Sequence, residues 1–202
     1  MKFGECLKSY GVTALWHMTH LSNLESILDK GLFCKNLANN QVVYRDISDS
    51  HVQSRRGEAH NYVPFYFADN TAMLYNVASL DCKVIMLQVS TEAADCEGVR
   101  FSDGNVAANA THVFDDPAKL ADLDWNMIQA SHRAIYGEWK RKRMAEVLIP
   151  ESCASSNIRV IHVQNALADG GRVSDLVKAI VNKFSNLQIS VQENLTPKGI
   201  RS

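Results

Sequence analysis

The run Val84-Ile85-Met86-Leu87-Gln88-Val89 is the feature of this sequence that most constrains its fold. Five of its six residues are apolar, and a strand of this composition needs cover on both of its faces. We therefore predict that residues 84–89 form a central β-strand. The rest of the chain must provide the layers on either side of it.

Other strands and helices are expected around this run in an irregular order. We predict strands at 14–18, 62–67, 145–149 and 158–163, and helices at 22–31, 71–78, 117–131, 134–143 and 174–184. The polar residues 36–61 are expected to form a long loop with a short helix near 47–56, and residues 101–112 a polar loop. Strands and helices intermix without a regular βαβ alternation, which favours the α+β class over a doubly wound sheet.

The length of the chain limits its domain organisation. At 202 residues, of which 46% are hydrophobic, the chain can bury a sizeable core and is too short for two full-sized enzyme domains. We therefore expect a single domain at 1–202. Its motifs lie between about residues 14 and 150, and residues 151–190 are expected to add a C-terminal strand and a helix.

The sequence predicts neither export nor membrane insertion. No apolar run approaches the ~20 residues that span a bilayer, and the N-terminal MKFGECLKSYG lacks the apolar middle and the cleavage site of a signal peptide. The five cysteines are an odd number and form no CxxC pair, so they are expected to be reduced thiols. These features predict a cytoplasmic protein that does not contact a membrane.

Several catalytic and metal-binding motifs are missing from the sequence. It has no Walker-type loop, no GxGxxG after a strand, no HExxH and no GxSxG, which disfavours P-loop phosphoryl transfer and hydride transfer on a Rossmann scaffold. His17, His20 and Cys34 come nearest to a metal site. A fourth ligand is missing at the usual spacings, and histidines three residues apart on a strand face opposite sides. We expect no metal.

A strand followed at once by a helix brings polar residues together early in the chain. Ser22 and Glu25 have the spacing of a capping box, and Gly31 stands where a glycine commonly ends a helix. His17 and Thr19 are then expected at the end of the preceding strand, beside the helix N-terminus. Unpaired backbone N–H groups at such a place suit a phosphate or amide ligand. On residue type alone, packing or hydrogen bonding explains His17 better than a ligand does.

Glu146 is the most informative single residue. It lies in the apolar strand predicted at 145–149, where a carboxylate either points outward by alternation or is held inward for a purpose. Residue type alone favours the outward position. By the same standard, Arg56 would be a solvated arginine at a helix end, and Tyr66 and Tyr75 would pack in the core or at an edge.

The charge of the chain limits how it could bind nucleic acid. Its formal net charge is -1, and affinity for phosphates grows with the number of cations placed against them, so any contact must be local. Two basic clusters could provide such a contact, Arg55-Arg56 and Lys140-Arg141-Lys142-Arg143. The pattern alone favours a solvated helical face for the second cluster.

Seven short blocks of the sequence resemble, in order and with similar spacing, the DarT family of DNA ADP-ribosyltransferases. The blocks are 15–24 (LWHMTHLSNL), 50–56 (SHVQSRR), 62–67 (YVPFYF), 72–75 (AMLY), 103–105 (DGN), 123–125 (LDW) and 143–148 (RMAEVL). No single block is decisive. Their common order over residues 14–150 outweighs the ordinary explanations given above for His17, Arg56 and Glu146.

This resemblance implies an ADP-ribosyltransferase fold, with two small β-sheets around a cleft for NAD and with flanking helices. It implies that Glu146 and Arg56 are the essential catalytic residues. The residues expected to bind NAD as co-substrate are His17, Thr19, Asn23, Arg56, Tyr66 and Tyr75. Asn105 falls on the loop expected to meet the acceptor base. The basic residues expected to bind nucleic acid beside it are Arg55, Lys140, Arg141 and Arg143.

The function implied is NAD-dependent mono-ADP-ribosylation of a base, thymine or guanine, in single-stranded DNA. Such an enzyme would be a toxin of a toxin-antitoxin or phage-defence system, and its antitoxin would be a separate DarG-like macrodomain. Cleavage of the bond between nicotinamide and ribose leaves an oxocarbenium-like sugar, which a carboxylate can stabilise. Glu146 is assigned that role and the role of base, because Arg56 has a pKa above ~12. Arg56 is expected to grip a phosphate or a base carbonyl.

Two alternatives stay open on the sequence. An RNA-directed relative would carry the same motifs, because contacts to the 2'-OH groups that distinguish RNA from DNA cannot be identified in a sequence. A catalytically inactive nucleic-acid-binding module on the same fold would account for the basic run at 140–143 and the aromatic strand at 62–67. Such a module would have no need of His17, Arg56 and Glu146 together.

Overall fold

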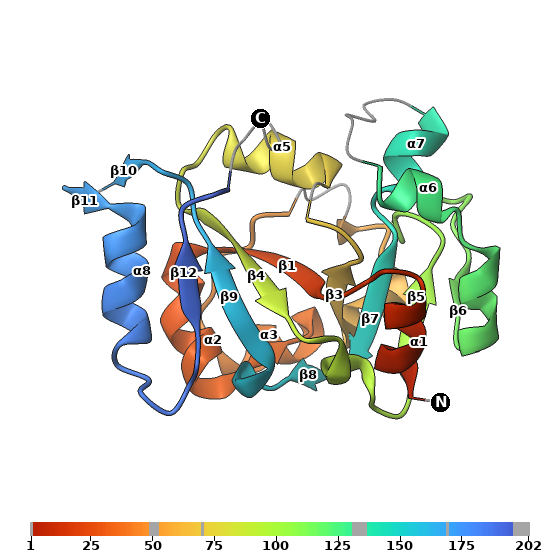
Figure 1. The fold of residues 1–202 in the computed structure, drawn as a ribbon, viewed down its shortest axis with the longest axis horizontal. Helices are drawn as coiled ribbons and strands as arrows, with labels where there is room; N and C mark the ends of the chain where they lie inside the picture. Colours follow the sequence, from red (N-terminus) through yellow and green to blue (C-terminus); the bar gives the residue numbers. More distant parts are fainter. Residues whose placement is uncertain (1, 49–52, 70, 131–136, 169, 196–202) are drawn as a thin grey trace.

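The computed structural model describes residues 2–48, 53–69, 71–130, 137–168 and 170–195 (Figure 1). The α-helices are α1 (Phe3–Ser9), α2 (Leu24–Lys30), α3 (Lys35–Gln41), α5 (Ala72–Ala78), α6 (Trp125–Ile128), α7 (Gly137–Lys142) and α8 (Val173–Val181). Short 3₁₀ helices are η1 (Leu21–Asn23), η2 (Gly57–Asn61), η3 (Thr91–Ala94), η4 (Pro117–Asp122) and η5 (Ser155–Asn157). The strands are β1 (Leu15–His20), β2 (Leu32–Phe33), β3 (Tyr62–Tyr66), β4 (Val84–Val89), β5 (Arg100–Ser102), β6 (Val113–Phe114), β7 (Glu146–Pro150), β8 (Ser152–Cys153), β9 (Ile158–His162), β10 (Leu167–Ala168), β11 (Gly171–Arg172) and β12 (Ser190–Gln192).

Eight of these strands form one sheet in the order β12-β9-β4-β1-β3-β7-β5-β6. The neighbouring strands run antiparallel except for β12 and β9, which are parallel. The strand β4 lies inside the sheet between β9 and β1, as the apolar run at 84–89 predicts. Two further two-stranded sheets pair β10 with β11 and β2 with β8. The irregular mixture of strands and helices confirms the α+β class.

The large sheet consists of two halves that meet at one residue pair. The strands β1 and β4 are paired over six residues, and β3 and β7 over five. Between the halves, the register that joins β1 to β3 within the described ranges is the single pair Trp16↔Tyr66. The two small sheets that were expected are therefore four-stranded halves, joined here and diverging beyond this pair. Pro64, which has no N–H to donate, lies in the part of β3 that is not paired with β1.

Side chains alternate between the two faces of the sheet and build two cores. The larger core contains Ile85, Leu87 and Val89 of β4, together with residues of α1, α2 and α8. The smaller core contains Val84 and Met86 of the same strand, together with residues of α5. Both faces of β4 are therefore covered, as its apolar sequence requires.

The start of the second α-helix differs from the prediction. The strand β1 ends at His20, so Thr19 lies at the strand end as expected and His17 lies in the middle of the strand. The 3₁₀ helix η1 follows, and α2 begins at Leu24 rather than directly after Ser22. The backbone N–H of Ser22 donates to Nδ1 of His20, which caps this segment in place of the expected capping box. Gly31 follows α2 with a φ of 92°, a conformation open to glycine without strain, as predicted.

Short elements lie where the sequence indicated loops or a longer helix. The expected loop at 36–61 contains α3 and η2, and the short helix expected near 47–56 falls partly on residues 49–52, outside the described ranges. The polar stretch at 101–112 lies between two short strands, β5 and β6. The helix expected at 117–131 is divided into η4 and α6. Elements this short carry too little periodicity to be recognised in a sequence.

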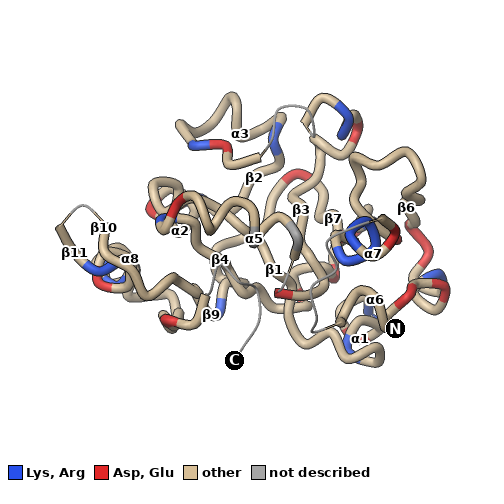
Figure 2. The backbone as a smooth tube through the Cα atoms, turned by 90° about the horizontal axis from the view of Figure 1, so that it is seen from above, with Lys and Arg blue, Asp and Glu red and all other residues tan. Residues whose placement is uncertain are grey.

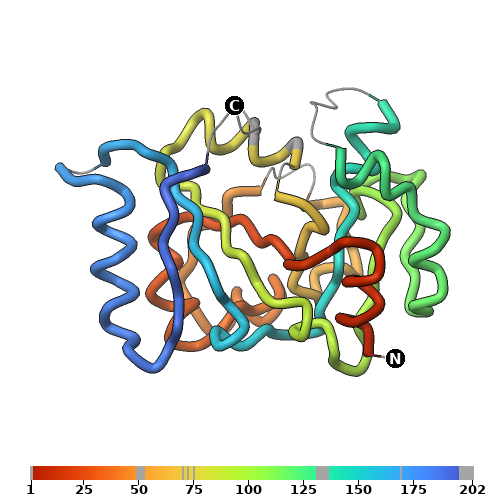
Figure 3. Tube along the Cα trace, in the orientation of Figure 1, coloured from red at the N-terminus to blue at the C-terminus, as the bar shows by residue number. Residues whose placement is uncertain are grey.

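The C-terminal residues complete one edge of the large sheet. The strand β9 pairs with β4, β12 pairs with β9, and α8 packs beside them, at the blue end of the chain in Figure 3. The opposite edge is formed by β5 and β6.

Within the described ranges, no helix is both long and apolar enough to cross a bilayer.

Candidate active site

A cavity lies where the two halves of the sheet part. The strands β1 and β3 diverge from the pair Trp16↔Tyr66, and residues of both line the cavity. These residues are His17, Met18, Thr19, Tyr62, Pro64 and Tyr66. The alternate residues of β3, Val63 and Phe65, belong to the larger core. Strand backbone that is fixed by core packing therefore positions the side chains of the cavity.

A buried ion pair lies beside this cavity. Glu146 begins β7 and is directly opposite Tyr66 of β3. The Arg56 guanidinium donates two hydrogen bonds to its carboxylate, from Nη1 to Oε1 at 3.0 Å and from Nη2 to Oε2 at 2.6 Å. The side chain of Glu146 is 1% exposed and that of Arg56 is 10% exposed. Glu146 is thus held inward by a specific partner, contrary to what its residue type alone favoured.

Burial and charge act in opposite directions on Arg56. Burial alone would lower the pKa of its guanidinium, but the charge and hydrogen bonds of Glu146 raise this pKa by more. Arg56 therefore stays protonated and cannot serve as a base near neutral pH. The Oε2 atom of Glu146 keeps a second lone pair beyond the one used by Arg56, so the carboxylate can also accept a hydrogen bond from a ligand.

Tyr66 lines the cavity next to this pair. Burial raises the pKa of its phenol, and the negative charge of Glu146 adds to the effect, so the hydroxyl is neutral. That hydroxyl donates to Sδ of Met73 at 3.3 Å. A thioether is a weak acceptor, so a ligand oxygen can replace it at little cost.

The hydrogen bond made by His17 fixes its protonation state. Its Nδ1 lies 2.9 Å from the carbonyl oxygen of Pro64, which can only accept, so Nδ1 carries the proton. Burial lowers the pKa of the imidazole below its ordinary 6.5, which keeps the ring neutral at pH 7. Nε2 is therefore an acceptor. It suits the donor groups that NAD carries, the carboxamide N–H and the ribose hydroxyls.

Asn23 holds a loop at the edge of the cavity. Its side-chain amide donates to Oγ1 of Thr19 at 3.0 Å and to the carbonyl of Arg45 at 2.9 Å, and its oxygen accepts from the Arg45 amide at 2.7 Å. The Arg45 guanidinium donates a hydrogen bond from Nη2 to Oδ2 of Asp81 at 3.0 Å, and its Nη1 lies 2.9 Å from Nε2 of His20. The amide of Asn23 is thus occupied within the protein, while the hydroxyl of Thr19 keeps a hydrogen to donate.

Known proteins of similar sequence point to one family. The model of the DarT family, described as an ssDNA thymidine ADP-ribosyltransferase, matches residues 16–194. The chain belongs to the DarT family. A DNA ADP-ribosyl transferase of Thermus sp. (strain 2.9) is 32% identical over 193 residues, which cover 85% of this chain and 88% of that protein. A fusion protein of Thermosipho africanus, which joins a DNA ADP-ribosyl transferase to a DNA ADP-ribosyl glycohydrolase, is 26% identical over 84% of this chain and 46% of its own length.

Solved DarT structures share the fold of this chain. Thermus sp. 2.9 DarT in complex with ADP-ribosylated ssDNA has a TM-score of 0.76 at 27% identity, covering 92% of this chain and 96% of that one. The same protein in complex with NAD+ has a TM-score of 0.72 at 26% identity, covering 91% and 97%. The expected ADP-ribosyltransferase fold and enzyme class are therefore confirmed.

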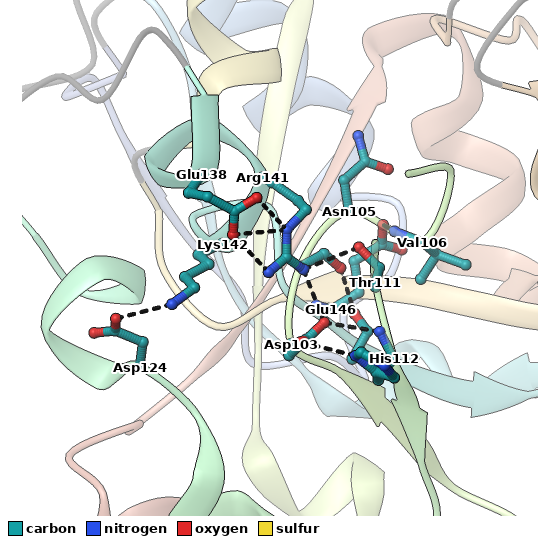
Figure 4. A network of polar contacts seen from close by, with 12 residues as sticks. Asp103, Asn105, Val106, Thr111, His112, Asp124, Glu138, Arg141, Lys142 and Glu146 are labelled. Carbon is teal, nitrogen blue, oxygen red and sulfur yellow. Dashed lines mark hydrogen bonds and ion pairs between the residues drawn. The ribbon is translucent and has the colours of Figure 1, made fainter. Parts of the chain in front are cut away.

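In this DarT protein, the segment between β5 and β6 lies beside Glu146 (Figure 4). The hydroxyl of Ser102 accepts from the Glu146 backbone N–H at 3.0 Å and donates to the carbonyl of Gly104 at 2.6 Å. The Val106 backbone N–H points to Oε1 of Glu146 at 3.4 Å. Asn105 lines the cavity. The structure thus brings Asn105, the residue expected to meet the acceptor base, to the cavity lined by His17, Thr19 and Tyr66, which are expected to bind NAD.

The basic residues expected to bind nucleic acid differ in their surroundings. Arg55 and Lys140 are exposed. Arg143 is buried, with 4% exposure, and burial lowers the pKa of its guanidinium. Arg141 is bound to two carboxylates of the protein, and Figure 2 shows cationic and acidic residues close together around α7. Arg141 and Arg143 are therefore engaged within the protein, whereas Arg55 and Lys140 face solvent.

Some residues of the cavity were not among the predicted site residues. Tyr44 and Arg45 line it from the segment expected to be a loop, and they lie in no block that resembles the family. Met73 and Met144 also line it, and their places in the blocks 72–75 and 143–148 are signals that could have located them. The side chain of Tyr75, expected to bind NAD, lies outside the described part of the structure. Among the described residues, no group of three or more His, Cys, Asp or Glu could hold a metal ion.

Proposed function

We propose that this DarT protein transfers ADP-ribose from NAD to a thymine base in single-stranded DNA, with Glu146 as its catalytic carboxylate. The observation that carries the proposal is the buried Arg56–Glu146 pair where the two halves of the sheet part. The relatives support the choice of substrates, because Thermus sp. 2.9 DarT has been solved with NAD+ and with ADP-ribosylated ssDNA. The family description names thymidine.

In this proposal, NAD is held by side chains from both halves of the sheet. Nε2 of the neutral His17 accepts from the nicotinamide carboxamide, and the Thr19 hydroxyl donates to the same half of NAD. Tyr66 gives up its weak bond to sulfur and donates to NAD. Asn23 acts indirectly, because its amide keeps the loop at Arg45 in place. A direct contact from Tyr75 stays a prediction.

The chemistry follows from a carboxylate held in a buried position. The bond between C1' of the ribose and the nicotinamide nitrogen breaks, and nicotinamide leaves as a neutral molecule with the bonding electron pair. The positive charge that develops on the ribose is stabilised by Glu146, which acts strongly because water is largely excluded there. A ring nitrogen of thymine then bonds to C1' and loses its proton to Glu146. Arg56 stays protonated, holds the carboxylate and grips a base carbonyl or a phosphate.

The acceptor strand is proposed to lie against Asn105, with its phosphates near the exposed cations Arg55 and Lys140. Transfer from labelled NAD to matched DNA and RNA oligonucleotides tests this choice. In one set, thymine (uracil in the RNA) is the sole pyrimidine. In the other set, guanine is the sole purine. We expect label on thymine-containing DNA and, after Glu146→Gln, labelling that is about 10²- to 10⁴-fold slower. Label on guanine or on RNA would assign the acceptor to that base or to RNA instead of thymine in DNA. Label on protein alone would contradict a nucleic-acid acceptor. Oligonucleotide binding without NAD binding in calorimetry would instead support the inactive module.

We also propose that the chain acts as a toxin in the cytoplasm, where both NAD and DNA are present. The Thermosipho africanus relative contains a DNA ADP-ribosyl glycohydrolase in the same polypeptide. Here the corresponding antitoxin would be a separate DarG-like macrodomain. Induced expression should stop bacterial growth, and co-expression of a macrodomain hydrolase should restore it. Growth arrest by the Glu146→Gln variant would show that toxicity does not come from transfer.

A further inference from the structure

One arginine ties the segment that carries Asn105 to helix α7. Nη1 of Arg141 donates to Oδ1 of Asp103 at 2.9 Å and to Oγ1 of Thr111 at 3.2 Å (Figure 4). The backbone carbonyl of Arg141 accepts from the Asn105 N–H at 2.9 Å. Arg141 therefore contacts this segment near its beginning, near its end and at the residue that lines the cavity.

Glu138 orients the Arg141 guanidinium from the other side. Nε of Arg141 lies 3.2 Å from both carboxylate oxygens of Glu138, and Nη2 donates to Oε2 at 2.9 Å. The Arg141 side chain is only 12% exposed. Carboxylates on two sides fix the plane of a guanidinium and use most of its donors. Little of Arg141 is left for a phosphate.

Gly104 allows the segment to approach α7 closely. A Cβ at this position would lie 2.5 Å from Nη1, 2.9 Å from Cγ and 3.0 Å from the backbone oxygen of Arg141. The last of these atoms is backbone and cannot rotate away. Any side chain at residue 104 would therefore push the segment away from the helix.

The same segment reaches the catalytic carboxylate. The Val106 N–H points to Oε1 of Glu146, and Ser102, the last residue of β5 before the segment, binds the Glu146 backbone N–H and the carbonyl of Gly104. A shift of the segment would therefore change both the place of Asn105 and the polar surroundings of Glu146. The NAD residues of β1 and β3 come from other elements of the fold and would stay in place.

We propose that Arg141 is a positioning residue for the acceptor side of the active site and not a phosphate contact. By holding Asp103, Asn105 and Thr111 against α7, it sets where the acceptor base sits relative to Glu146. This inference rests on the proposed function. We call the contacts of Arg141 with Asp103, Thr111 and the Asn105 N–H the clamp. Its loss should impair the reaction with the oligonucleotide and leave NAD binding unchanged, so the effects on the two substrates differ.

The variants Arg141→Gln and Asp103→Ala test the clamp by the sign of their effects. Both should lower kcat/KM for a thymine-containing oligonucleotide by about 10- to 100-fold, because a displacement of about 1 Å can cost that much. Calorimetry should give the same NAD affinity within about twofold. If Arg141 instead bound phosphate, Asp103→Ala would remove a nearby negative charge and would leave kcat/KM for the oligonucleotide unchanged or raise it. That outcome would overturn the proposal.

Salt dependence separates the clamp from a phosphate contact a second time. Loss of one phosphate contact lowers the slope of log K against log salt by about one. Lys140→Gln, on the same helix, should show that change together with weaker DNA binding, whereas Arg141→Gln should keep the wild-type slope. The double variant Arg141→Gln/Asp103→Ala should lose no more activity than either single variant, because all three lack the same clamp. A reduced slope for Arg141→Gln or additive losses would contradict the proposal.

Hydrogen exchange tests the clamp without any reaction. The N–H of Asn105 is bound by the Arg141 carbonyl, and the N–H of His112 by Oδ1 of Asp103. Both should exchange faster in Arg141→Gln and in Asp103→Ala than in the wild type, and at the wild-type rate in Lys140→Gln. Unchanged exchange in the first two variants would refute the clamp. If the wild-type chain modified no oligonucleotide, the proposed function would be refuted. Hydrogen exchange would still test the clamp, because it needs no reaction.

Discussion

Arg56 and Arg141 each bind carboxylates, yet their surroundings differ. Arg56 binds one carboxylate, Glu146, and the two side chains are 10% and 1% exposed. Arg141 binds two carboxylates, and one of them, Glu138, is 62% exposed. A buried charge depends on its partner because water cannot replace it, whereas an exposed carboxylate is partly solvated. Burial therefore distinguishes the pair that is proposed to carry the chemistry from the pair that is proposed to position a segment.

The largest expected difference is in stability. Arg56→Ala leaves the charge of Glu146 buried without its partner and should lower the free energy of unfolding by about 3 kcal/mol. Arg141→Ala should cost about 1 kcal/mol, since solvent reaches its partners. Urea unfolding of the two variants at pH 7 measures both values. Equal losses would show that burial does not distinguish the two pairs.

A second substitution extends this comparison by removing the buried charge of Glu146 that Arg56→Ala leaves without a partner. Adding Glu146→Gln to Arg56→Ala should recover about 2 kcal/mol of the unfolding free energy, because no unpaired charge is left in the interior. The same addition to Arg141→Ala should not recover stability. Urea unfolding of the two double variants provides the test. Further loss in the Arg56→Ala background would mean that the ion pair is not what stabilises this region.

The third prediction concerns His17, the neutral imidazole that lines the cavity, and the dependence of stability on pH. Its pKa in the folded state lies below 6.5, so the unfolded chain binds a proton first as the pH falls. Its contribution to stability is therefore complete above about pH 6.5 and is lost below it. His20 and His60 also have lowered pKa values and act in the same direction. Stability should fall less steeply between pH 7 and 5 in His17→Gln than in the wild type, and equal slopes would contradict a neutral His17.

The smallest effect is expected at Arg55, the exposed neighbour of Arg56 in the sequence. Arg55→Gln should weaken oligonucleotide binding about two- to fivefold, since an exposed cation interacts weakly, and should lower the salt slope by about one. Its urea midpoint should equal that of the wild type. Fluorescence anisotropy over a range of salt concentrations measures the binding. An unchanged slope would remove Arg55 from the DNA interface.

The regular parts of the fold could be predicted from the sequence. The strand at 84–89 has the predicted bounds, and α5 follows its N-cap Thr71 within one residue of the prediction. These segments carry a long apolar run or a capping residue, which are local signals. The joint at Trp16↔Tyr66 has no local signal, because it depends on how two strands 50 residues apart in the sequence diverge. The short strands β5 and β6 have too few residues for a pattern.

The site was predicted in part, for a similar reason. Ordered motifs indicated Glu146 and Arg56, although residue type alone favoured surface positions for both. The structure adds that they are partners, which their separation of 90 residues hides in the sequence. The contact of Arg141 with Asp103, 38 residues away, is hidden in the same way, and a run of basic residues indicated nucleic-acid binding instead. Residue type indicates what a charge can bind, and the fold decides which partner it meets.

Mass spectrometry of one oligonucleotide tests the role of Glu146 most directly. Glu146→Gln keeps the shape of the side chain and one acceptor for Arg56 while removing the charge that is proposed to stabilise the transition state. With NAD and a single-stranded DNA that contains thymine, the wild type should add one ADP-ribose. The variant should bind NAD and form the adduct about 10²- to 10⁴-fold more slowly. Adduct formation by Glu146→Gln at the wild-type rate would contradict the account.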